Sequence, residues 1–194
     1  MGGGDLQART GSDDATSAIS QLRVFINYRH EDTRWAAWAL YFKLEDEFGA
    51  ENVFFDNGTL RAGMQWFDEI QERVGDCGAF VALIGPRWQS SLIAHLQRGG
   101  PDYVAREIHM ALLSRSGMTM IPVLVDDADP PDVLALPAGM RPLMGCHAER
   151  LRYTHARSDI EQLAQRLREL AGGAASGETD RVETGDGHDE LETM

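Results

Sequence analysis

The sequence predicts an α/β fold, because short apolar runs alternate with amphipathic segments about five times between residues 21 and 171. Most of the apolar runs lack polar alternation, which indicates strands buried on both faces and therefore a parallel sheet. The segments between them repeat apolar residues at helical spacing. Together these observations predict a flavodoxin-like, doubly wound sheet of five parallel strands with helices on both faces. In such a sheet, ligands lie beyond the carboxyl ends of the strands.

The first half of this domain is predicted to contain three strands and two helices. The strands are expected at residues 23–28, 52–55 and 78–84. The first helix opens at Asp32 or Thr33 and ends at Gly49. Its apolar stripe is formed by Ala37, Leu40, Tyr41, Leu44 and Phe48. The second helix covers residues 64–74, and its inward-facing side chains are Phe67, Ile70 and Val74.

The second half begins with a helix at residues 101–113, whose first turn Asp102 can cap. Its buried stripe is formed by Val104, Ile108, Ala111 and Leu112. A strand follows at residues 118–125, in which Pro122 has no N–H to donate and favours a sheet edge or a bulge. A loop rich in Pro and Asp covers residues 126–142.

A short strand near residues 148–151 and a last helix complete the domain. Ser158 and Glu161 have capping-box spacing and are expected to open that helix. Its inward-facing side chains are Ile160, Leu163, Leu167 and Leu170. Residues 1–20 and the acidic segment 172–194 are predicted to be disordered, which leaves one folded domain at residues 21–171.

Composition excludes several classes of partner and compartment. The formal net charge of −13 argues against nucleic acid or an anionic membrane surface as a main partner. No apolar run is long enough to span a bilayer, and the N-terminus lacks the plan of a signal peptide. Cys77 and Cys146 lie far apart without metal-like spacing, which favours reduced thiols in a cytoplasmic protein.

The sequence lacks the motifs, or the motif spacing, that several common classes of enzyme require. The first predicted strand is followed by neither Gly-x-Gly-x-x-Gly nor a Walker-type loop, so a dinucleotide oxidoreductase or an NTPase is disfavoured. The six histidines show no metal-ligand spacing, and nothing resembles a nucleophile elbow. A response-regulator receiver needs paired acids where this chain has Asn27, Tyr28 and Arg29. We therefore expect neither a metal nor a cofactor.

Three polar stretches fall at the predicted carboxyl ends of strands, namely residues 28–32, 56–63 and 85–88. Each also has a purely structural interpretation. Arg29 and Asp32 could form a salt bridge within a loop. Gly58 and Gly63 could be turn glycines. Trp88 could cover the core.

Tyr103 and Glu107 lie four residues apart and therefore side by side on the helix at residues 101–113. An aromatic ring beside a carboxylate at the rim of a core could hold a flat heterocycle and act on the sugar attached to it. The alternative is an ordinary solvated Glu with a Tyr near the helix end.

Five stretches, in order and at family spacing, resemble the boxes of a bacterial-type Toll/interleukin receptor (TIR) domain. They are residues 24–32, 53–63, 81–88, 102–108 and 121–137. The resemblance extends from about Arg23 to Leu170 and implies the same five-stranded sheet. Some members of that family only bind other TIR domains, whereas others cleave NAD+ into nicotinamide and ADP-ribose, linear or cyclised.

Tyr103 and Glu107 resemble the NAD-cleaving branch, although its pattern often has Trp in place of Tyr103. Many TIR domains also carry Pro-Gly where this chain has Ala62 and Gly63. The resemblance implies an NAD+ glycohydrolase that acts in immune or defence-type signalling, with NAD+ as substrate. It also implies self-association through TIR–TIR contacts, and contacts with other TIR proteins are an open alternative. A non-catalytic TIR–TIR scaffold is the competing hypothesis.

The reaction requires only one carboxylate. An O-glycosidase needs two, because its leaving oxygen must be protonated. Nicotinamide in NAD+ is already cationic and leaves as a neutral molecule, so the enzyme has to hold the ribose and stabilise the oxocarbenium ion. We assign that task to Glu107, with Tyr103 as a stacking wall.

Further contacts follow from the resemblance. The candidates for phosphate and adenosine contacts are Tyr28, Arg29 and Arg61, and another wall could come from Trp66 or Trp88. Gly63 is expected in a loop, here called the BB loop (residues 56–63), that contacts a neighbouring protomer and shapes the pocket.

Overall fold

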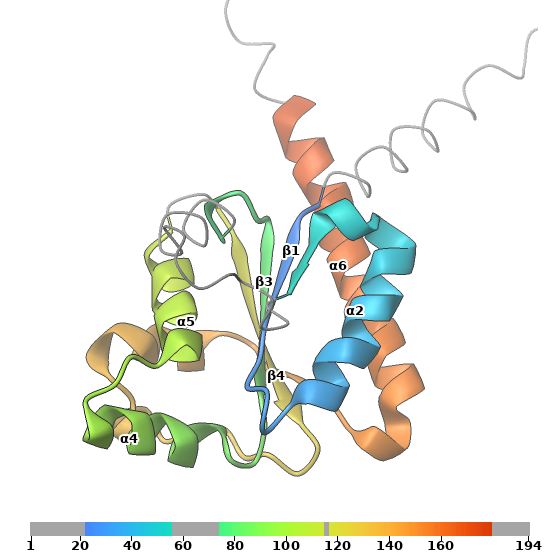
Figure 1. Ribbon diagram of the computed structural model, residues 1–194. Coiled ribbons are helices and arrows are strands. Elements are labelled where there is room, and N and C mark those ends of the chain that lie inside the picture. Colours follow the sequence, from blue (N-terminus) through green and yellow to red (C-terminus); the bar gives the residue numbers. More distant parts are fainter. Residues whose placement is uncertain (1–21, 56–73, 115–116, 180–194) are drawn as a thin grey trace, which may run out of the picture.

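The computed structural model describes residues 22–55, 74–114 and 117–179, with side chains up to residue 173. These residues form three layers, with a sheet in the middle and helices on both faces (Figure 1). The helices are α2 (Arg34–Phe48), α4 (Trp88–Arg98), α5 (Tyr103–Leu113) and α6 (Ala156–Thr179). Short 3-10 helices are η1 (Ala50–Asn52), η2 (Val133–Ala135), η3 (Ala138–Gly145) and η4 (Tyr153–His155).

The sheet has five parallel strands in the order β2-β1-β3-β4-β5. They are β1 (Val24–Asn27), β2 (Val53–Phe55), β3 (Ala79–Ile84), β4 (Thr119–Val125) and β5 (Glu149–Leu151). The chain first extends outward from β1 to β2 and then returns to the other side of β1. The predicted flavodoxin-like fold is therefore confirmed, and the loops after β1 and β3 flank the point where ligands bind in such sheets.

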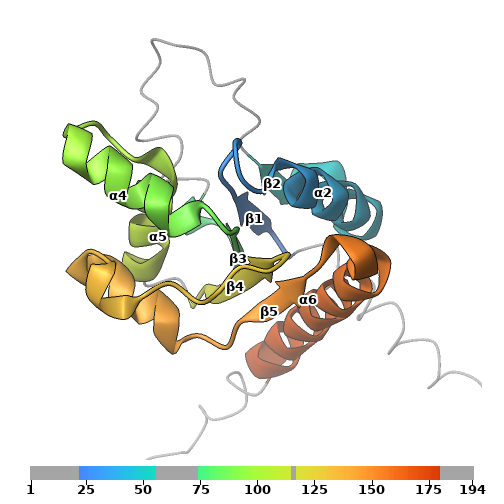
Figure 2. The same cartoon turned by 90° about the horizontal axis from the view of Figure 1, so that it is seen from below.

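Alternate residues of each strand face opposite layers. Val24, Ile26 and Val81 pack against α2 and α6, whereas Phe25 and Phe80 pack toward α4, α5 and η3. The Phe25 and Phe80 rings stack with their centroids 5.2 Å apart. Figure 2 shows the two helical layers on either side of the sheet. Because both faces are covered, the strands read as continuous apolar runs.

The predicted strands agree with the structure to within one or two residues. The helix expected from Asp32 or Thr33 is α2, and Gly49 ends it at a φ of 86°, a value that favours glycine. Helix α4 was not predicted. Its sequence contains two Ser, two Gln and a His, and only Trp88 and Leu92 are buried, so the apolar stripe is too short to be recognised.

Pro122 lies at a locally open edge of the sheet, as expected, although β4 is not an edge strand and has no bulge there. β4 is an interior strand, and its register against β3 continues through Pro122 without interruption. The ladder to β5 starts only at Val123, so at Pro122 the sheet has a paired neighbour on one side alone. On the unpaired side, toward β5, the strand needs no backbone N–H at position 122, so proline is tolerated there.

The predicted capping box at Ser158 is also wrong. Helix α6 already begins at Ala156, and the Ser158 hydroxyl donates to the His155 carbonyl oxygen. The neighbouring Asp159 carboxylate makes the main contacts instead. It accepts hydrogen bonds from the Arg152 backbone N–H, at 2.9 Å, and from the Arg152 guanidinium, at 2.8 and 2.9 Å.

The structure extends past one predicted domain boundary and does not describe one predicted helix. Helix α6 continues to Thr179, so the predicted domain boundary at residue 171 falls inside it. The helix predicted at residues 64–74 lies outside the described residues except for Val74, which is buried. No helix in the described ranges is both long and apolar enough to cross a membrane.

Both cysteines are reduced thiols, but their surroundings differ. Cys77 is 2% exposed in the core beneath α4 and α5. Burial raises the pKa of its thiol to about 12. Cys146 follows η3 and is only partly buried.

Candidate active site

A cavity of about 320 Å³ lies where the loop after β1 meets the start of α5. Its lining residues are Ile26, Tyr28, Arg29, His30, Glu31, His95, Pro101, Asp102, Tyr103, Val104 and Glu107. The cavity is at the carboxyl end of β1, next to the point where the strand order reverses. The fold therefore places it where a doubly wound sheet binds ligands.

Glu107 is buried at the inner side of this cavity, with 5% of the residue exposed. Its Oε2 accepts a hydrogen bond of 2.7 Å from Asn27 Nδ2 at the end of β1. The expected position at the helix rim is therefore wrong, and so is the alternative of a solvated Glu. Burial of a carboxylate is costly unless hydrogen bonds compensate for it, and the Asn27 amide supplies one of them.

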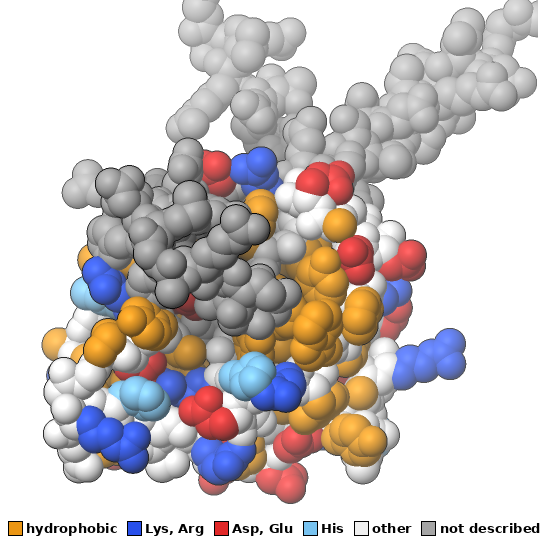
Figure 3. Space-filling view, viewed as in Figure 1, with side chains coloured by type: hydrophobic (Ala, Val, Ile, Leu, Met, Phe, Trp, Pro, Cys, Tyr) orange, Lys and Arg blue, Asp and Glu red, His pale blue; other side chains and the backbone are white. Residues whose placement is uncertain are grey.

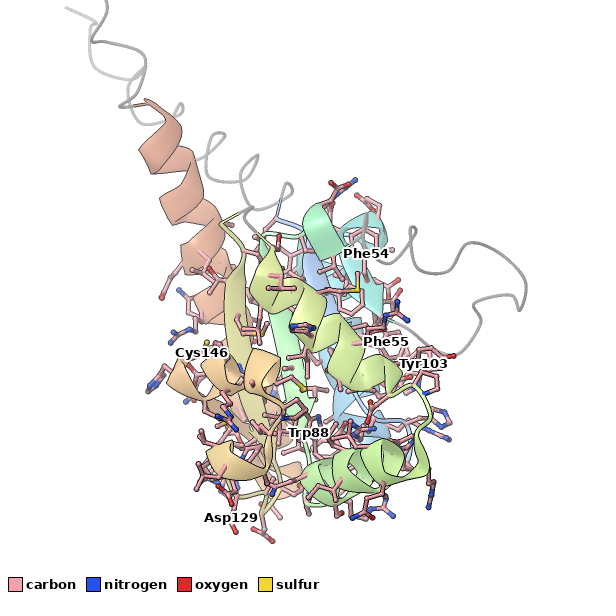
Figure 4. The ribbon with its side chains drawn as sticks, turned by 90° about the vertical axis from the view of Figure 1, so that its left-hand side faces the viewer. Phe54, Phe55, Trp88, Tyr103, Asp129 and Cys146 are labelled. Carbon is pink, nitrogen blue, oxygen red and sulfur yellow. The ribbon has the colours of Figure 1, made fainter. Side chains whose placement is uncertain are left out.

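Tyr103 lies one helical turn before Glu107 and is 51% exposed. Its ring projects from the start of α5 and lines the same cavity (Figure 4). The spacing of four residues brings the ring and the carboxylate to one side of the helix, as expected. The ring is therefore at the outer side of the cavity and the carboxylate is at the inner side.

Arg29 forms a buried ion pair with Asp102. Its Nη2 lies 2.5 Å from Asp102 Oδ2, and the two side chains are 3% and 4% exposed. The predicted loop pair of Arg29 with Asp32 is wrong, since Asp32 Oδ1 instead accepts the Arg87 backbone N–H at 3.1 Å. A phosphate would have to compete with Asp102 for the Arg29 guanidinium, so its predicted substrate contact stays a prediction.

Trp88 belongs to the core and not to the cavity. It is fully buried, and the Arg29 guanidinium lies 5.7 Å from the centre of its ring. Figure 4 shows Trp88 in the interior, at the start of α4. This corrects the expectation of a substrate wall and agrees with the alternative that Trp88 covers the core.

Tyr28 lines the cavity from the other face of the sheet. Only 7% of it is exposed, and its ring stacks on Phe55 with centroids 5.0 Å apart. Beyond Phe55 the aromatic cluster continues over α2 to Trp38 and Tyr41. On the face in Figure 3, hydrophobic side chains gather over α2, and histidines and charged side chains gather below the grey atoms.

The family model of the TIR domain matches residues 24–170. The chain belongs to the TIR domain family. No curated protein matches it.

One solved structure similar to this TIR domain is that of the TIR domains in "the activated Roq1 resistosome directly recognizing the pathogen effector XopQ". The identity is 20%, the TM-score is 0.44, and the match covers 85% of this chain and 92% of that chain.

Three predicted site residues of the TIR domain, Arg61, Gly63 and Trp66, lie outside the described residues. The BB loop lies there as well, so these predictions stay open. The structure brings together Tyr28, Arg29, Tyr103 and Glu107, and all four line the cavity.

Sequence reasoning missed Asn27, His30 and His95 as parts of this site. His30 and His95 line the cavity, and the His95 Nδ1–H donates to the Ser91 carbonyl oxygen at 2.8 Å. A signal existed for Asn27, because it is a polar residue at the end of an otherwise apolar strand and faces the same layer as Phe25. His30 lies in the polar stretch 28–32 at the end of the first predicted strand, whereas His95 gave no comparable signal.

Proposed function

We propose that this TIR domain is an NAD+ glycohydrolase that cleaves the nicotinamide–ribose bond. The products are nicotinamide and either ADP-ribose or a cyclic isomer. The observation that carries the proposal is the buried Glu107 carboxylate inside a cavity whose outer side holds the exposed ring of Tyr103. Family membership supports it, because one branch of TIR domains performs this reaction.

The reaction makes one main demand on the protein. When the bond between ribose and nicotinamide breaks, its electron pair stays on the pyridine nitrogen, and nicotinamide leaves neutral. The ribose becomes an oxocarbenium ion, which water attacks before a proton is lost to solvent. An anion beside the ribose stabilises this cation most strongly where water is scarce, which is the setting that Glu107 has.

The cavity suits the nicotinamide-riboside half of the substrate. Its volume of about 320 Å³ is at the lower end of the range for small-molecule pockets. In our proposal the Tyr103 ring stacks on the flat nicotinamide and Tyr28 contacts the adjacent part of the substrate. The phosphates and adenosine extend toward Arg61, for which family resemblance is the only argument.

We further propose that self-association activates the enzyme in immune or defence-type signalling, since the BB loop of the family contacts a neighbouring protomer. Specific activity is then expected to rise with protein concentration. Gly63→Val is expected to lower activity with little loss of fold, because a β-carbon would disturb the loop. Specific activity that stays flat from dilute to concentrated protein would contradict this part of the proposal.

The decisive experiment replaces the carboxylate. Glu107→Gln keeps size and helix propensity but removes the charge, so nicotinamide release is expected to fall by about 10²-fold or more. Glu169→Gln is the matched control, because it makes the same change on the exposed surface of α6. Nicotinamide is measured by chromatography, and circular dichroism checks the fold of each variant.

Two outcomes would overturn the proposal in different ways. If Glu107→Gln releases nicotinamide as fast as the wild type, the carboxylate is elsewhere, and Glu31 on the cavity wall is the next to test. If the wild type releases none even when concentrated or crowded, the protein is a non-catalytic TIR–TIR scaffold.

A further inference from the structure

We infer that Asn27 is a positioning residue whose side-chain amide holds the Glu107 carboxylate fixed in the cavity. The inference rests on the proposed NAD+ cleavage. It extends that proposal to a residue at the end of β1 that lies 80 positions from Glu107 in the sequence.

The hydrogen bonds fix the orientation of the Asn27 amide. Nδ2 donates to Glu107 Oε2 at 2.7 Å and to the Val104 carbonyl oxygen at 3.2 Å. Both partners can only accept when the carboxylate is ionised, so the nitrogen and not the oxygen must face them. The two bonds also span almost one turn of α5 and therefore fix Glu107 relative to the sheet.

The Asn27 Oδ1 atom indicates that the contact between Asn27 and Glu107 was not selected for stability alone. Asn27 is 1% exposed, and among the described residues its Oδ1 has no hydrogen-bond partner. An unsatisfied buried acceptor costs free energy, which an apolar residue of similar size would avoid. What the apolar residue could not do is donate to Glu107.

Asn27 does not line the cavity, so it cannot contact a substrate there. Any effect of Asn27 on catalysis must therefore pass through Glu107. A change at Asn27 should lower kcat and leave the KM for NAD+ nearly unchanged. A residue that binds substrate would change KM as well.

The amide also favours the ionised carboxylate, because a hydrogen bond donated to a carboxylate stabilises its charged form. Burial acts in the opposite direction, because it favours the protonated acid. Other titratable groups line the cavity, from the loop after β1, α4 and α5: Tyr28, Arg29, His30, Glu31, His95, Asp102 and Tyr103. These groups are present in the wild type and in every Asn27 variant, so only the difference between pH profiles reports on Asn27.

The catalytic test uses Asn27→Leu, which is nearly isosteric but has no donor. We expect kcat to fall about tenfold or more, KM to change less than about twofold, and the acid limb of the kcat profile to move up by about one pH unit or more. A merely structural role would lower stability without moving that limb. Where the leucine variant fails to fold, Asn27→Ser replaces it, because its hydroxyl is one atom too short to make the same bond.

A second test examines the contact without using activity. Asn27→Asp places two carboxyl groups about 2.7 Å apart, and such a pair holds one shared proton with a raised pKa. The native state then binds a proton that the unfolded state has lost, so stability is present at low pH and is lost as pH rises. We expect the Tm of Asn27→Asp to fall at least about 5 °C more than that of the wild type between about pH 5 and about pH 8.

The control is the double variant Asn27→Asp/Glu107→Gln, in which the amide and the carboxylate are exchanged. Its extra pH dependence of Tm should vanish, because the introduced glutamine can donate to the introduced aspartate, yet nicotinamide release should not return. A double variant as active as the wild type would mean that a carboxylate at either position supports the reaction, and this would overturn the positioning role of Asn27.

The outcomes separate the inference from the proposed function. An active wild type whose kcat profile is unchanged in Asn27→Leu overturns the positioning role alone. If the Tm of Asn27→Asp depends on pH no more than that of the wild type, side chains 27 and 107 are not in buried contact, and the inference is overturned. A wild type that releases no nicotinamide overturns the proposed function and the role of Asn27 with it, whatever the Tm measurements show.

Discussion

The Asp102 carboxylate pairs with Arg29 and thereby holds the loop after β1 against the first turn of α5. One oxygen lies 2.5 Å from the Arg29 guanidinium, and the other accepts the Ala105 backbone N–H at 3.0 Å, which caps the helix. The predicted N-cap is thereby confirmed. Because α5 carries Tyr103 and Glu107, the Asp102 side chain acts together with Asn27 in setting their position relative to the sheet.

Removing the cation of this pair should destabilise the fold strongly. Arg29→Met removes the guanidinium from the buried Asp102 carboxylate and leaves the His95 ring, 3.8 Å away, as the only basic side chain beside it among the described residues. Breaking a buried ion pair in this way typically costs about 3–5 kcal/mol. Arg29→Met/Asp102→Asn should recover part of that loss, because Asn can still cap the helix and carries no charge. Urea unfolding measures both variants. Equal stability of Arg29→Met and the wild type would show that the ion pair contributes nothing.

Tyr103 should affect substrate binding and not the fold. With half of the residue exposed, Tyr103→Ala should leave the Tm almost unchanged but raise the KM for NAD+ by roughly twofold to tenfold, the range expected for one lost aromatic contact. Tyr103→Trp keeps a stacking surface and should stay close to the wild type. An unchanged KM in Tyr103→Ala would remove the ring from the substrate site.

Asp159 should make stability depend on acid pH. The hydrogen bonds from the Arg152 guanidinium hold the pKa of this carboxyl below its ordinary value of about 3.9. Its contribution is therefore complete above about pH 4 and is lost as pH falls through the lowered pKa. Asp159→Asn should cost about 1.5–3 kcal/mol at pH 7, and the difference from the wild type should shrink below about pH 4. A difference that is constant with pH would contradict the ion-pair explanation.

Gly85 lies where the loop after β3 meets the loop after β1. A β-carbon there would lie 2.5 Å from Asp32 Oδ2 and 2.6 Å from Thr33 Cγ2, both closer than real contacts. Gly85→Ala should therefore lower stability by about 1–3 kcal/mol. Gly100→Ala is the matched control, since a β-carbon there meets nothing within 4 Å. Thermal unfolding compares the two, and equal melting temperatures would show that the loops can separate without cost.

The fold was predictable because its information is local. The fully buried runs of β1 and β3 read as parallel strands in isolation, and Gly49 marks the end of α2 by a backbone rule. Helix α4 was not predicted from the sequence because it buries only two side chains. Pro122 could not show that β4 lies inside the sheet, because the pairing of β4 with its neighbours is set by residues distant in the sequence.

The site was predictable only in part. The spacing of Tyr103 and Glu107 places them together on one helix, and that follows from helical geometry. The depth of Glu107, its bond to Asn27 and the pairing of Arg29 with Asp102 join residues that lie 73 to 80 positions apart. No local pattern encodes such pairings, so the sequence did not predict the Arg29–Asp102 ion pair and left open whether Trp88 lies on the cavity wall or in the core.

The contrast between the two thiols provides a built-in reporter of core opening. A maleimide reacts with the thiolate, and Cys77, with a pKa of about 12 and almost no exposure, offers essentially none in the native state. Native protein should therefore accept a single label, at Cys146, and chain that has lost its packing should accept a second. Mass spectrometry of the labelled protein over time would then count, molecule by molecule, how often the layer beneath α4 and α5 comes apart.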